Sequence, residues 1–208
     1  DRRMAFAALS SSWIGRSGFR LMAVYASVTC ILSMWMSNTA TTAMMFPLGV
    51  AVLAELGRER KGDREFQRYA LAMMLVTSFA ATIGGMGTPV GTPPNLIGVG
   101  LLRTTADINI SFTGWMLVGV PIVILTMAFI TVWFLVPRSR GIQLGPDAVR
   151  TVADELRKLG TMTVGERNVV LAFSVTVALW VLPGVFSLAL GDAHALTRRF
   201  ATLVPESV

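Results

Sequence analysis

Long stretches without a charged residue dominate the chain. Four of them occupy residues 21–54, 69–102, 108–137 and 168–191. Each exceeds the roughly 20 apolar residues that a helix needs to cross a hydrocarbon core about 30 Å thick. The pattern therefore predicts an integral membrane protein whose membrane-embedded elements are helices.

The loops between these stretches differ in their basic residues, and this difference predicts an orientation. Residues 1–20, 55–68 and 137–167 hold most of the Lys and Arg residues, whereas residues 103–111 hold Arg103 alone. Basic loops tend to stay on the cytoplasmic side of a membrane. We therefore expect the first three segments inside the cell and residues 103–111 outside.

Two of the charge-free stretches do not fit a simple span. Residues 21–54 would begin and end on the cytoplasmic side. As one continuous helix they would be about 51 Å long, whereas two full crossings need roughly 60 Å. They are predicted to form a re-entrant hairpin with its tip near Ser37 and Asn38. Residues 69–102 must cross, but "GGMGTPVGTPPN" at 84–95 contains four Gly and three Pro, which interrupt a helix. This stretch is predicted to be a broken transmembrane helix.

The remaining stretches, 108–137 and 168–191, are predicted to be ordinary transmembrane helices. Thr163 and Glu166 have the spacing of a capping box, which would start the second of these helices. The flanking segments are predicted to be an amphipathic, interfacial segment at 1–20, a cytoplasmic linker with a short helix at 138–167, and a polar tail at 192–208.

Composition supports a membrane protein. The chain is 53% hydrophobic and 14% charged, with a mean hydropathy of +0.63, whereas soluble domains carry about 25% charged residues. The net charge of +6 comes from basic loops that set the orientation of the protein in the membrane. The lipid bilayer, and not nucleic acid, is therefore the expected partner. Cys30 is the single cysteine and His194 the single histidine, which excludes a disulfide within the chain and a zinc cluster.

The two interruptions contain the candidate binding residues. Irregular backbone at membrane depth is tolerated when it is buried in protein or lines a wet cavity, and paired breaks mark the substrate sites of many secondary transporters. Ser33 and Ser37 are one helical turn apart, Asn38 adds an amide oxygen, and Gly87 can expose a carbonyl; such oxygens suit a hard cation. Packing between helices is the alternative interpretation, because Ser, Thr and Gly are common at such contacts.

Neither interruption contains a charged residue. A bound anion would therefore depend on hydroxyl, amide and backbone donors, with a bound cation as countercharge, and each ion would lower the cost of burying the other. No His, Cys or acidic residue lies at the midpoint of an apolar stretch. The sequence thus offers no general base or nucleophile, and an enzyme is not expected.

Two long motifs resemble those of the divalent anion:sodium symporter family, which carries di- and tricarboxylates and, in some members, sulfate. They are "SMWMSNTATTAMMFPLGVAV" at 33–52 and "IGGMGTPVGTPPNLI" at 83–97. The resemblance implies an all-α, multi-pass protein of the inner membrane with two inverted repeats, each containing a re-entrant hairpin and a broken helix. It also implies a homodimer and an elevator-like movement of the domain that holds the hairpins.

Carried across position by position, the resemblance implies one sodium site and half of a substrate site. Family members are longer, with scaffold helices before this region and a second repeat that would begin at 168–191, so a fragment or a truncated product is expected. The implied residues are Ser33, Ser37, Asn38 and the carbonyl of Gly87 for Na⁺, and Asn38 and Thr39, with Thr88 and Pro89 nearby, for the anion.

The expected function is sodium-coupled symport of a divalent anion such as succinate, malate or fumarate. Three other interpretations remain open at this point. They are a sodium-independent dicarboxylate exchanger on the same scaffold, an arsenite-type permease or channel of related architecture, and a membrane assembly subunit that does not transport.

Overall fold

The computed structural model describes residues 17–58, 60, 62–139, 141–143 and 163–190. The amphipathic opening segment, the short linker helix and the polar tail predicted from the sequence lie mostly or wholly outside these residues. Within them the chain is all-α, apart from turns and one isolated bridge between Ser17 and Gln143. The elements are α2 (Gly18–Ser33), α3 (Asn38–Leu56), α4 (Arg64–Gly85), α5 (Pro93–Ala106), α6 (Phe112–Ile130), the π-helical turn η1 (Thr131–Leu135), α7 (Val136–Ser139) and α9 (Val164–Leu190).

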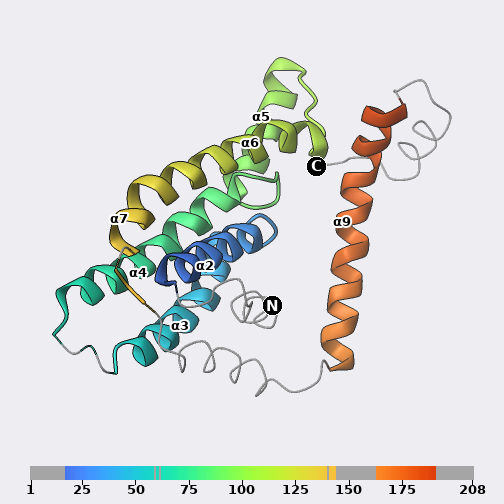
Figure 1. Cartoon of the computed structure of the whole chain (residues 1–208). Coiled ribbons are helices and arrows are strands. Elements are labelled where there is room, and N and C mark those ends of the chain that lie inside the picture. The colour runs from blue at the N-terminus through green and yellow to red at the C-terminus, as the bar shows by residue number, and fades with distance from the viewer. Residues whose placement is uncertain (1–16, 59, 61, 140, 144–162, 191–208) are drawn as a thin grey trace.

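Helices α2 and α3 run back alongside each other and are joined by a short turn at residues 34–37 (Figure 1). Ser17 caps the start of α2 by accepting a hydrogen bond from the amide of Arg20 at 3.4 Å. Ser37 caps α3 in the same way, through the amide of Ala40 at 3.3 Å. Side-chain oxygens at these positions satisfy amides that a helix start leaves unpaired, so the sequence itself sets where both helices begin.

Helices α4 and α5 are separated by the linker 86–92. Helix α4 ends at Gly85, and α5 begins at Pro93 with proline in its first turn. Proline has no amide hydrogen and a fixed φ, so it suits a helix start and breaks a helix interior. Helix α5 ends at Ala106 and is followed by Asp107, whose positive φ of 54° is a left-handed conformation common at helix ends.

Helix α6 continues through η1 and α7 as one long helical element. Ser111 caps it through the amide of Gly114 at 3.0 Å. The predicted capping box before α9 is present: Glu166 accepts from the amide of Thr163 at 2.7 Å, and the amide of Glu166 donates to the Thr163 hydroxyl at 3.2 Å. Among the described residues, the helices long and apolar enough to cross a membrane are Asn38–Leu56, Phe112–Ser139 and Val164–Phe186.

The core lies between α2, α3 and α4. Tyr25 is fully buried there; its hydroxyl donates to the carbonyl of Met45 at 2.9 Å and shares a hydrogen bond with the hydroxyl of Thr77 at 2.8 Å. In contrast, large apolar side chains such as Leu125 and Trp133 are 70% exposed on the α6–η1 element. The core is mostly apolar and its buried hydroxyl groups at Tyr25 and Thr77 are hydrogen-bonded, while the apolar exterior of α6 is expected when the surroundings are lipid.

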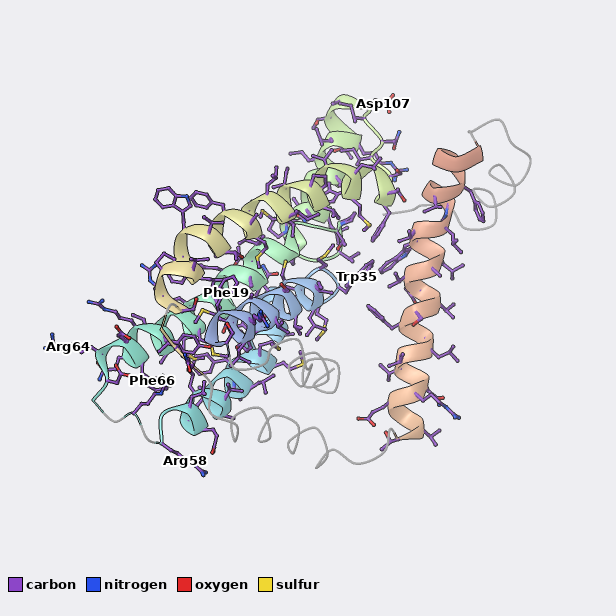
Figure 2. All side chains as sticks on the ribbon, viewed as in Figure 1. Phe19, Trp35, Arg58, Arg64, Phe66 and Asp107 are labelled. Carbon is purple, nitrogen blue, oxygen red and sulfur yellow. The ribbon has the colours of Figure 1, made fainter. Side chains whose placement is uncertain are left out.

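Aromatic side chains join the 34–37 turn to α6 and α9. Trp35 stacks on Phe112 with ring centroids 6.2 Å apart and meets Phe173 edge-on at 6.0 Å. Phe112 in turn stacks on Trp180 at 5.4 Å. Figure 2 places Trp35 at the end of the α2–α3 pair that faces α9.

Basic residues gather at the opposite end of the bundle. Arg58 and Arg64 lie at this end, and Asp107 lies at the far end (Figure 2). The guanidinium of Arg60 donates to the carbonyl of Gln143 at 2.6 Å. This contact brings the segment after α3 to the segment after α7, as expected if both lie on the cytoplasmic side.

Candidate functional site

The two interruptions of the helical backbone meet at Asn38. The hydroxyl of Ser33 donates to Asn38 Oδ1 at 2.8 Å, and Ser33 is fully buried. Gly85, the last residue of α4, borders the same oxygen, because a Cβ atom added to Gly85 would overlap Asn38 Oδ1. The end of α2, the start of α3 and the end of α4 therefore converge on one amide oxygen.

A hydrogen bond joins the 34–37 turn to the 86–92 linker. The hydroxyl of Thr88 donates to the carbonyl of Met34, which lies past the end of α2, where carbonyls lack helical partners. Thr88 is fully buried. Gly87 lies beside the same turn, and a Cβ there would be 2.8 Å from Met34 Cε.

Asn95 closes the break from the other side. It lies in the first turn of α5 and is only 9% exposed. Its side-chain amide donates to the carbonyls of Gly85 and Thr88, both at 2.8 Å. Gly91 packs on Gly85, since a Cβ on Gly91 would be 2.5 Å from the Gly85 carbonyl oxygen. Asn95 thus holds the end of α4 and the linker in fixed positions relative to α5.

An open pocket of ≈ 520 Å³ lies beside Asn38, between α3 and α4. None of the described residues that line it is ionisable, but an amide and four hydroxyl groups are among them. Because the pocket lies at the start of α3, the partial positive charge of that helix end favours an anion there. The lining residues are Asn38, Thr39, Thr42, Ala43, Phe46, Pro47, Ser78 and Thr82.

The structure brings some of the predicted cation ligands together. Ser33 and Asn38 are in contact, while Ser37 is exposed and uses its oxygen to cap α3. The carbonyl of Gly87 lies close to α6, where a Cβ on Gly119 would be 3.2 Å from it. A Cβ on Gly85 would meet the amide of Asn38, whereas one on Gly87 would first meet Met34 and the carbonyl of Gly84.

Two of the four residues predicted to contact the anion line the pocket, and two do not. Asn38 and Thr39 line the pocket. Thr88 and Pro89 are buried outside it, and the Thr88 hydroxyl is bonded to the 34–37 turn.

Sequence reasoning missed several residues of this site. Asn95 was not singled out, although its position directly after Pro93 and Pro94 puts it in the first turn of a half-helix. Ser78 and Thr82 were missed as well. Their spacing of four residues within a charge-free helix was the available signal, because it places both hydroxyls on one helix face.

Comparison with known proteins agrees with the motifs and with an all-α membrane protein. The family described as the sodium:sulfate symporter transmembrane region matches residues 1–197. Similar proteins include the sodium-dependent dicarboxylate transporters SdcS of Staphylococcus saprophyticus and of Staphylococcus aureus strain USA300, each 31% identical over 172 residues. The matches cover 81% of this chain and 33% of each relative, so the chain spans about a third of the length of these relatives. The chain belongs to the sodium:sulfate symporter family of multi-pass membrane transporters.

Proposed function

We propose that these residues form half of the binding site of a sodium-coupled symporter for divalent anions, with C4 dicarboxylates such as succinate, malate and fumarate as substrates. The observation that carries the proposal is the contact of Ser33, Asn38 and Gly85 beside a pocket lined by hydroxyl groups. The sodium-dependent dicarboxylate transporters among the relatives support the substrate class and the coupling ion.

The donor set near Asn38 fits Na⁺. Ser33 Oγ and Asn38 Oδ1 are neutral oxygens 2.8 Å apart, so a hard cation bound to one lies close to the other. Ser37 adds a hydroxyl at the adjacent start of α3. We place Na⁺ at Ser33, Ser37 and Asn38, with the main chain near Gly85 as the linker's contribution in place of the carbonyl of Gly87.

The anion would bind on the pocket side of the same amide. Asn38 and Thr39 both line the pocket, and their amide and hydroxyl groups can donate hydrogen bonds to carboxylate oxygens. Thr88 and Pro89 support this arrangement from the buried side. In a pocket without a basic residue, a bound Na⁺ supplies the positive charge, so the two ligands strengthen each other's binding.

The membrane arrangement that we propose follows from the helix ends. The start of α2 and the end of α3 lie at the basic end of the bundle (Figure 1), so this pair would enter from the cytoplasm and return to it. Helices α4 and α5, with the break between them, would together cross the membrane. The binding site then lies at the turn and the break, away from both surfaces.

Uptake of labelled succinate into proteoliposomes tests the proposal, with the full-length gene product that contains these residues. Uptake should require an inward Na⁺ gradient and stop when K⁺ or choline replaces Na⁺. Undiminished uptake in K⁺ would overturn symport, and uptake that requires internal dicarboxylate would identify an exchanger. Absence of any dicarboxylate uptake would overturn the substrate class.

Substitutions at the turn separate the two ligands. Asn38→Ala should lower the apparent affinity for both Na⁺ and succinate, because one side chain serves both. Ser37→Ala should chiefly weaken Na⁺ activation, and Thr39→Val should chiefly raise KM for succinate. If Asn38→Ala showed wild-type kinetics, the Ser37-Asn38-Thr39 motif would serve helix packing and not binding.

A further inference from the structure

The wall of the pocket opposite Asn38 is formed by two hydroxyl groups on α4. Ser78 and Thr82 are both exposed and both line the pocket. They are four residues apart and so lie on one face of the helix. Thr39 and Thr42 face them from α3. Helices α3 and α4, which are consecutive along the chain, thus direct four hydroxyl groups into one open pocket.

The hydroxyl groups of the pocket are free to donate hydrogen bonds, unlike several other hydroxyl groups in the described helices. Several threonine hydroxyls donate to the carbonyl four residues earlier, as Thr77 does to Met73 at 3.0 Å, and Thr126 does to Ile122 at 2.8 Å. Among the described residues, the buried hydroxyls of Thr41 and Thr113 have no such partner. Within the described part of the chain, the four pocket hydroxyls make no hydrogen bond to protein groups. Each therefore has a donor available for a bound molecule.

The comparison with Thr126 favours polar surroundings for the pocket. Thr126 is partly exposed on the apolar surface of α6, and its hydroxyl is satisfied within its own helix, as lipid surroundings favour. Ser78 and Thr82 are more exposed than Thr126 and lack such a bond. Leaving these hydroxyls unpaired in lipid would be costly, so this face is expected to meet water and a polar ligand.

The ligand class follows from what the pocket offers. The described lining has hydroxyl and amide donors and lacks any side chain that is ionisable. Such donors bind oxygen atoms that carry negative charge, and hydrogen bonds to a charged acceptor are stronger than those between neutral groups. The pocket volume of ≈ 520 Å³ leaves space for a small anion to contact both helices.

We infer that Ser78 and Thr82 donate hydrogen bonds to a carboxylate of the transported anion and form the second wall of its site. The inference rests on the proposed function, and it adds α4 side chains to a substrate site otherwise built from the 34–37 turn and the start of α3.

Uptake kinetics of Ser78→Ala and Thr82→Val in the full-length gene product test this inference. Loss of one hydrogen bond to a charged group should raise KM for succinate about tenfold, and the Na⁺ concentration for half-maximal uptake at saturating succinate should stay near that of the wild type. Ser78→Thr, which keeps the hydroxyl, should restore most of the affinity. Thr126→Val is the matched control, since it removes a hydroxyl that is already bonded within its helix.

A labelling experiment covers variants that transport too slowly to measure. Thr82→Cys, in a background where Cys30 and other native cysteines are replaced, should react with a negatively charged aqueous thiol reagent, and succinate with Na⁺ should protect it. Wild-type uptake settles the proposed function separately. If the wild type transports succinate, unchanged KM in both α4 variants, equal loss in Thr126→Val, or labelling that succinate does not reduce would each overturn the inference.

Discussion

The hydrogen bond from Thr88 to the 34–37 turn is the contact whose removal we expect to be most informative. Thr88 is fully buried, and its hydroxyl satisfies the carbonyl of Met34. Valine has nearly the same shape but no hydroxyl, so Thr88→Val would leave that partly buried carbonyl without this donor. Such a loss costs about 1–3 kcal/mol, which corresponds to roughly a five- to 140-fold change in an equilibrium constant.

The cost should appear mainly as weaker Na⁺ binding, because the turn joins Ser33 to Asn38 and the proposed cation contacts both. Labelled succinate uptake, measured across a range of Na⁺ concentrations, should show a higher Na⁺ requirement in Thr88→Val. Thr88→Ser keeps the donor and serves as the control. The reasoning would be refuted if Thr88→Val kept the wild-type Na⁺ dependence, or if Thr88→Ser were equally impaired.

Three further predictions concern the packing around the break. Gly85→Ala places a Cβ against the amide oxygen of Asn38. This overpacking costs about 1–3 kcal/mol and should weaken Na⁺-dependent uptake. Gly98→Ala is the control and should leave uptake unchanged, because the added atom meets nothing within 4 Å. Asn95→Ala removes two buried hydrogen bonds and should lower the thermal unfolding temperature in detergent, and a wild-type temperature would contradict the bridging role. Tyr25→Phe removes hydrogen bonds to α3 and α4 and should cost about 1–2 kcal/mol of stability, with transport kinetics unchanged if the core and the site are independent.

The all-α membrane fold could be predicted from the sequence because its signals are local. Charge-free stretches locate apolar helices, serine and threonine mark helix starts, and the glycines and prolines of 84–95 mark the break. The structure ends α4 at Gly85 and starts α5 at Pro93, inside that motif. Each of these features depends on residues that are neighbours along the chain.

Contacts between distant segments could not be predicted in the same way. Spacing along the sequence does not show whether Gly85 or Gly87 lies beside Asn38, because this depends on how α4 packs on α2. In the structure, Gly84 of α4 lies against the carbonyl of Cys30 in α2. That close approach fixes which face of the α4 end meets the turn. The direction of the Thr88 hydroxyl also depends on this packing, and spacing along the sequence carries no record of it.

The central claim is that the two interruptions meet at Asn38 and bind Na⁺ together with a dicarboxylate. Binding of labelled succinate to the purified full-length protein, measured across a range of Na⁺ concentrations, tests it most directly. We predict that Na⁺ lowers the Kd for succinate, that succinate lowers the Kd for Na⁺ by the same factor, and that Asn38→Ala abolishes this coupling. Succinate binding of equal strength in K⁺, or full coupling in Asn38→Ala, would contradict the account.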